Sequence, residues 1–133
     1  MIVIGVDTHK RSHTLVALDA VTGAMRGQLT IAASDDGTLD ALRFAAEFDA
    51  ERVWALEDCR HVSGRLERAL VASGDRVVRV ALGLTETSRR AVREPGKSDP
   101  IDATAIARAA LREGIGTLPV AFLDDQAHEI RVL

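Results

Sequence analysis

The sequence predicts an α/β protein built on a five-stranded mixed sheet, and three observations support this prediction. The chain has 133 residues, of which 47% are apolar and 28% charged, a composition typical of one soluble domain. Its first quarter contains three β-type segments joined by short polar turns, as in an antiparallel meander. The rest alternates helical and β-type segments, which indicates parallel strands reached through helical crossovers.

The meander is predicted from strands at residues 1–7, 15–19 and 28–33. Ile and Val dominate the first of these with little alternation, which is typical of a strand buried on both faces. A helix follows, because Ser34 is a good N-cap and apolar residues recur at largely helical spacing as far as about Phe48.

Strands are predicted next at residues 52–57 and 76–80, with a helix at 61–73 between them that is closed by Gly74. A polar, basic region follows from Thr85 to Lys97, and a last helix begins near Asp99. The order β-β-β-α-β-α-β-α is that of a ribonuclease-H-like α/β fold.

Two acidic residues close predicted strands, Asp7 at the end of the first and Glu57 at the end of the fourth. By analogy with the fold, these two strands are neighbours at the sheet centre. Open α/β sheets bind their ligands at the carboxyl ends of the strands, so the two carboxylates are expected to meet there.

Two further acids open the last helix. Asp99 and Asp102 are three residues apart and therefore share a helix face. Asp102 also lies above the stripe that is expected to pack on the sheet, which consists of Ala105, Ile106 and Ala109. An acidic side chain is thus expected to point inward.

Converging carboxylates repel one another unless protons or cations neutralise them. Hard oxygen ligands without clustered Cys or His favour Mg²⁺ or Mn²⁺. Two such ions, about 4 Å apart, stabilise the attacking and leaving oxygens of a phosphoryl displacement. The sequence therefore predicts phosphodiester chemistry at a two-ion site whose catalytic and metal-binding residues are Asp7, Glu57, Asp99 and Asp102.

Structural roles compete with these assignments. Asp99 could cap the helix with Pro100 at its first position, and Asp102 could complement the helix dipole. Asp58 competes with Glu57, since neighbours on a strand point to opposite faces. Three histidines are expected to be surface or core residues more often than ligands: His9, His13 and His61.

The formal charge of −3 disfavours a nucleic-acid partner, but two divalent ions would change it to +1. Basic residues also cluster, with Arg65 and Arg68 on the second helix. Such positive groups could contact backbone phosphates without reading the bases. Seven residues are predicted to bind nucleic acid: Lys10, Arg11, Arg60, Arg89, Arg90, Arg93 and Lys97.

Three segments, "GVDTHKRSHTLVALD", "WALEDCRHVSGRLERAL" and "REPGKSDPIDATAIARAAL", together resemble the N-terminal DEDD domain of the insertion-sequence transposases of the one-ten family, relatives of the pilin-gene invertases. That family's fold is similar to RuvC Holliday-junction resolvases. The resemblance places its acidic tetrad on Asp7, Glu57, Asp99 and Asp102. It implies a Mg²⁺-dependent DNA recombinase that mobilises an insertion element under the guidance of a structured bridge RNA, and a homo-oligomer is expected for the full-length protein.

The chain departs from the family pattern after Glu57, where members commonly carry a small residue and a Gly-x-Tyr. Residues 1–115 are expected to form the catalytic domain. Residues 116–133 are expected to begin a connector to a serine-bearing domain, without which full recombination is not expected. The predicted location is the cytoplasm, since no apolar run is long enough for a membrane span and Cys59 is the one cysteine.

Two other classes of function compete with the transposase. An actin-like or sugar-kinase-like ATPase also opens with a strand that ends in Asp, but "DTHKRSHT" lacks the glycine-rich phosphate loop that this class needs. A catalytically silent nucleic-acid-binding domain of the same fold is the other alternative.

Overall fold

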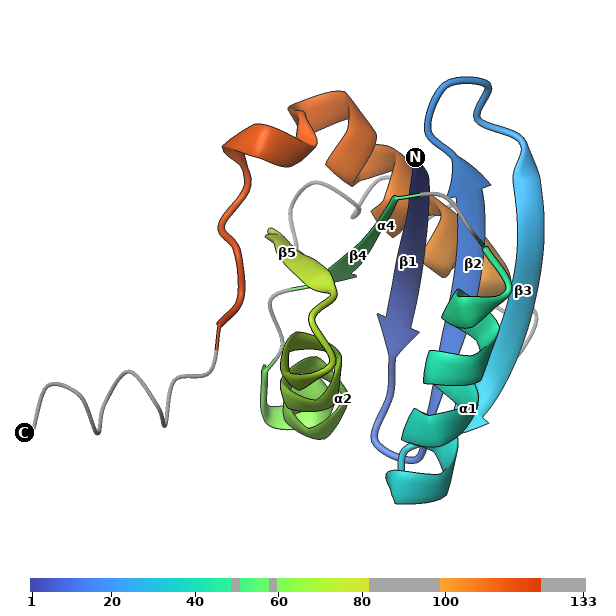
Figure 1. The fold of residues 1–133 in the computed structure, drawn as a ribbon, viewed down its shortest axis with the longest axis vertical. Coiled ribbons are helices and arrows are strands. Elements are labelled where there is room, and N and C mark those ends of the chain that lie inside the picture. The colour runs from blue at the N-terminus through green and yellow to red at the C-terminus, as the bar shows by residue number, and fades with distance from the viewer. Residues whose placement is uncertain (49–50, 58–59, 82–98, 123–133) are drawn as a thin grey trace, which may run out of the picture.

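The structure is a computed structural model that describes residues 1–48, 51–57, 60–81 and 99–122, with the side chains of residues 60 and 61 outside that description. A single five-stranded sheet with the order β3-β2-β1-β4-β5 lies at its centre (Figure 1). β1 pairs antiparallel with β2 and parallel with β4, so the predicted mixed sheet is confirmed. The strands are β1 (Ile2–Thr8), β2 (Ser12–Asp19), β3 (Met25–Ala32), β4 (Arg52–Glu57) and β5 (Arg76–Val80).

Helices cover both faces of this sheet, with α1 and α2 on one face and α4 on the other (Figure 1). Ser34 caps α1 as predicted, because its hydroxyl accepts a hydrogen bond from the backbone N–H of Gly37 at 3.1 Å. No described helix is long and apolar enough to cross a membrane. The helices are α1 (Asp35–Ala46), α2 (Arg60–Ala72) and α4 (Asp99–Glu113), followed by the short 3₁₀ helix η2 (Ile115–Thr117).

Alternate residues of β1 lie in two separate cores. Ile4 and Val6 are fully buried in the core beneath α1 and α2, whereas Val3 is buried beneath α4. Because side chains alternate along a strand, Gly5 and Asp7 share the α4 face with Val3. The acidic residue at the end of β1 therefore faces the helix that carries Asp99.

Close backbone contact brings α4 onto β1. A Cβ added at Gly5 would lie 2.1 Å from the carbonyl oxygen of Ala103 and 2.8 Å from the backbone nitrogen of Ala107. Two members of the predicted stripe, Ile106 and Ala109, are buried as expected, but the prediction was wrong for Ala105, which is half-buried. The reason is that the helix face in contact with the sheet centres on Ala103 and Ala107, which lie over Gly5. The buried residues of α4 are Ala103, Ile106, Ala107, Ala109 and Ala110.

After η2 the chain returns to the edge of β5. The backbone N–H of Arg79 donates to the carbonyl of Pro119 at 2.9 Å, and the N–H of Ala121 donates to the carbonyl of Val77 at 2.8 Å. Ala121 is buried in the core beneath α2. Residues 119–121 thus pack on the sheet itself, and the domain boundary at residue 115 stays a prediction.

Candidate metal centre

Asp7 is a buried carboxylate at the carboxyl end of the central strand. It lies opposite Thr14 of β2 in the register of the sheet, and only 1% of its surface is exposed. Burial raises the pKa of Asp7 to about 6, and the neighbouring carboxylates of Asp102 and Asp99 also raise it, while His9 acts in the opposite direction. Ionised Asp7 is therefore less favourable here than in water, and a nearby positive charge stabilises it.

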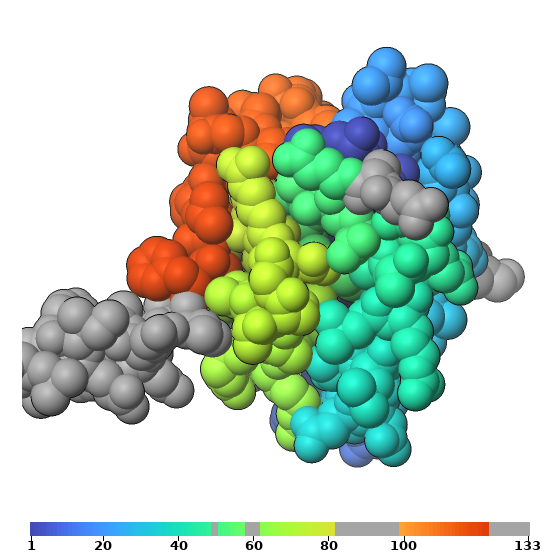
Figure 2. Space-filling view, in the orientation of Figure 1, coloured from blue at the N-terminus to red at the C-terminus, as the bar shows by residue number. Residues whose placement is uncertain are grey.

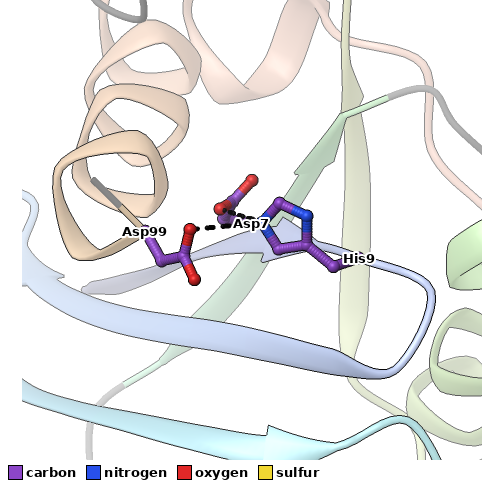
Figure 3. Close-up of side chains that lie close together, drawn as sticks. All are labelled: Asp7, His9 and Asp99. Carbon is purple, nitrogen blue, oxygen red and sulfur yellow. Dashed lines mark hydrogen bonds and ion pairs between the residues drawn. The ribbon is translucent and has the colours of Figure 1, made fainter. Parts of the chain in front are cut away.

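His9 supplies a cationic group at this position. Its Nε2 atom lies 2.7 Å from Oδ2 of Asp7 and 3.3 Å from Oδ1 of Asp99, so one imidazole nitrogen contacts both carboxylates (Figure 3). Burial lowers the pKa of His9, but the two carboxylates outweigh this effect and raise the pKa above 6.5. Protonated His9 thus balances the negative charge of Asp7 and Asp99.

The sequence prediction did not place His9 in this site. The signal that could have found it is the spacing Asp7-x-His9, since alternate residues at a strand end share a face. Using that signal requires knowledge that β1 runs on to Thr8, one residue beyond its predicted end.

The first turn of α4 supplies the other two acids. Asp99 is the first residue of the helix, and its carboxylate contacts His9. Among the described residues no helix amide donates to that carboxylate, so the capping alternative gains no support. Asp102 is half-buried and near enough to raise the pKa of Asp7, so this helix turn does point an acid inward.

Glu57 ends β4 on the same face of the sheet. It follows Val53 and Ala55, which lie in the core beneath α4, and only 3% of its surface is exposed. Val6 pairs with Leu56, so Asp7 and Glu57 end neighbouring strands at the same level. Among described residues, the potential ligand atoms within 4.8 Å of one another come from Asp7, His9 and Asp99, and that group does not include Glu57. Asp58 lies outside the described residues.

Few of the predicted nucleic-acid-binding residues lie in the described part of the chain. Lys10 and Arg11 are exposed in the turn between β1 and β2, beside the acidic site. Arg60 lies in α2, but its side chain is outside the description. The others lie outside the described residues, namely Arg89, Arg90, Arg93 and Lys97.

The donor set suits a divalent cation. Asp7, Asp99 and Asp102 contribute oxygen donors from two elements, and a buried carboxylate with a raised pKa gains most from a nearby positive charge. Carboxylate oxygens are the ligands that Mg²⁺ and Mn²⁺ prefer. The residues present therefore fit a metal ion of this kind at the end of β1.

Comparison with solved structures identifies the class of fold. Thermus thermophilus RuvC in complex with a Holliday junction superposes with a TM-score of 0.66 at 16% identity, over 91% of this chain and 99% of that chain. A second structure of Thermus thermophilus RuvC gives 0.65 at 18% identity, over 91% of this chain and 100% of that one. The domain therefore has the RuvC-like, ribonuclease-H-like fold that the sequence predicts.

Residues 4–133 match the family model of the DEDD transposases of the IS110 type, whose description is "Transposase". Since this match covers nearly the whole chain, the chain belongs to that transposase family, and the resemblance of its three motifs is confirmed. None of the curated proteins compared matches it. Transposases break and join phosphodiester bonds of DNA, so the chain belongs to the nucleotidyl-transfer enzymes in general.

Proposed function

We propose that this domain cleaves and transfers DNA strands of an insertion element with the help of Mg²⁺ or Mn²⁺, most simply two ions. Asp7, Glu57, Asp99 and Asp102 would hold the metal. The observation that carries the proposal is the buried carboxylate of Asp7, which lies close to Asp99 and His9 at the carboxyl end of the central strand. When bound, such ions stabilise the attacking and leaving oxygens of an in-line phosphoryl displacement.

The protein's own contribution is to fix the carboxylates. Asp7 is held by the hydrogen-bonded strands on both sides of β1, and Asp99 and Asp102 are held by the close contact of α4 with Gly5. Preorganised ligands of this kind need little rearrangement when the ion binds. His9 balances the charge of the carboxylates in the metal-free protein and would be displaced from that role by a divalent ion.

Several partners belong to the same proposal. The RuvC structure of the same fold is in complex with Holliday-junction DNA, and Lys10 and Arg11 are exposed beside the acids, both of which support DNA as a substrate. The family resemblance further implies a bridge RNA as guide, a homo-oligomer, and a serine-bearing domain for complete recombination. A recombination assay with this chain alone is expected to give no recombinant product.

A Mn²⁺ titration followed by thermal unfolding tests the metal site. Metal bound only to the folded state adds about 2.7 kcal/mol of stability at a hundredfold excess over its Kd. We expect this gain in the wild type and its loss in Asp7→Asn and Asp102→Asn. Asp40→Asn is the matched control, because Asp40 is an exposed acid of α1. Equal gains in all four proteins, or a flat wild-type titration, would contradict the proposal.

Strand cleavage tests the reaction itself. Labelled linear and branched DNA duplexes are incubated with Mg²⁺ and the wild type, Asp7→Asn or Asp40→Asn. Nicking by the wild type and the control variant, but not by Asp7→Asn, is the expected pattern. Nicking that survives in Asp7→Asn would assign the chemistry to another site or to a contaminant.

A further inference from the structure

A hollow of about 330 Å³ lies at the same end of the sheet as the metal centre but on the opposite face of the sheet. It is enclosed by the turn after β1, the start of α1 and the first half of α2, and Figure 2 looks onto the face that α1 and α2 cover. We call it the basic hollow and define it by six of its lining residues, which are Lys10, His13, Ser34, Thr38, Arg65 and Arg68.

Positive charge dominates the basic hollow. Lys10, Arg65 and Arg68 are basic and exposed, and no acidic side chain of the described chain is among its lining residues. One acid contacts an arginine of the hollow: the carboxylate of Asp35 is 96% exposed and lies 3.7 Å from Nε of Arg65. Solvent screens that pair strongly, so the hollow keeps a net positive charge.

A hydrogen bond holds one of its guanidinium groups in place. Nη1 of Arg65 donates to the carbonyl of Ala33 at 3.0 Å, across from α2 to the start of α1. Arg68 lies along the same helix over Gly64, where an added Cβ would come within 3.1 Å of Nη1 of Arg68. Two planar donor groups therefore border the hollow together with the ammonium group of Lys10.

The turn after β1 connects this hollow with the metal centre. The backbone N–H of His9 faces Nδ1 of His13 at 3.4 Å, which places the proton of neutral His13 on Nε2, where it can serve as a donor. The side chain of His9 contacts the acids, and Lys10, the next residue, lines the basic hollow. A polyanion that crosses this end of the sheet would meet both sites.

We propose that the basic hollow binds a backbone phosphate of a nucleic-acid strand that crosses this end of the sheet beside the metal centre. Several cationic donors without an acid suit a phosphate, which offers several acceptor oxygens, and Arg pairs with it through two parallel hydrogen bonds. Contacts of this kind position a strand without reading its sequence. The inference rests on the proposed function, because that function makes nucleic acid the ligand.

Fluorescence anisotropy with labelled single-stranded DNA and RNA of one sequence, in EDTA at several salt concentrations, tests this inference. Arg65→Gln and Arg68→Gln are each expected to weaken binding about tenfold, as for a lost charged hydrogen bond. Each should also reduce the salt slope by about 0.7, the value for one phosphate contact of a single strand. Arg43→Gln is the matched control, because this exposed arginine of α1 lies outside the hollow and should leave both quantities unchanged.

The two probes separate the sources of the phosphate. Weaker binding of DNA alone assigns the hollow to the substrate, weaker binding of RNA alone assigns it to a guide, and weaker binding of both assigns it to either strand. No binding by the wild type, no effect of either variant, or an equal effect of Arg43→Gln would overturn the inference. Since the anisotropy assay in EDTA reads nucleic-acid binding without metal, and the Mn²⁺ titration reads the metal site without nucleic acid, a failed metal site and a failed phosphate site are distinguishable.

Discussion

Replacing Gly5 by alanine should disrupt the metal centre from beneath. The new Cβ would lie 2.1 Å from the carbonyl oxygen of Ala103, whereas ordinary van der Waals contact begins at 3.4 Å. Because the obstacle is helix backbone and not a flexible side chain, α4 must move away from β1 by roughly 1 Å. Overpacking of this kind costs about 1–3 kcal/mol, and occasionally more, so Gly5→Ala should lower the free energy of unfolding by at least that amount.

The displacement should also weaken metal binding, since a shift of about 1 Å exceeds the tolerance of a preorganised site. Urea unfolding in EDTA measures the first effect, and the Mn²⁺-dependent rise in melting temperature measures the second. Gly27→Ala is the matched control, a glycine of β3 whose added Cβ would meet the ring of Phe44 at an ordinary 3.4 Å. If Gly5→Ala unfolds and responds to Mn²⁺ as Gly27→Ala does, close packing at Gly5 does not position α4.

Three further predictions concern protonation, charge balance and the far end of the sheet. In EDTA the protein should lose stability as pH rises from about 4 to 8, because Asp7 and His9 both have raised pKa values when folded, and each contribution disappears as pH passes through the folded pKa. For Asp7 the difference between 3.8 and about 6 corresponds to about 3 kcal/mol, so urea midpoints of Asp7→Asn should depend less on pH, and identical pH profiles would contradict this. His9→Ala should bind Mn²⁺ about tenfold more tightly at pH 6, with a smaller gain at pH 8, because an imidazolium competes with the metal; weaker binding in a Mn²⁺ titration would instead make His9 a ligand. Asp75→Ala should cost about 2 kcal/mol in urea unfolding without changing the Mn²⁺ response, since Oδ2 of Asp75 accepts the N–H of the fully buried Trp54 at 2.9 Å; a loss under 0.5 kcal/mol would show that another group satisfies the indole.

Short apolar runs with clear boundaries made the parallel half of the sheet predictable from sequence. Residues 52–57 and 76–80 form β4 and β5 as predicted, because each run is rich in apolar residues and each is flanked by helical segments. The start of β2 was placed three residues too late, at Leu15. Its first residues, Ser12 to Thr14, are polar and form a strand because they pair with the end of β1, a tertiary effect that periodicity does not report.

The site was predictable only in part, for a similar reason. Its acidic residues fall at strand ends and a helix start, which local patterns locate, so Asp7 and Asp99 could be placed near each other. Which residues of α4 face the sheet depends on the close contact at Gly5, and this shifted the buried stripe away from Ala105. Local sequence shows Arg65 and Arg68 together on α2, but Lys10 joins them only when α2 packs beside the turn after β1, so the hollow itself could not be predicted.

The same geometry that prepares the metal centre also destabilises the metal-free fold. Docking of α4 brings Asp99 and Asp102 toward the buried Asp7, and each of them raises the pKa of Asp7, which means that the carboxylates repel. His9 offsets this repulsion from a side chain that is 49% exposed, so it can leave without breaking the core. In the proposed metal-bound state, a divalent ion would replace this weak, pH-dependent balancing charge by a strong one, and the free energy of metal binding would offset the repulsion among the acids.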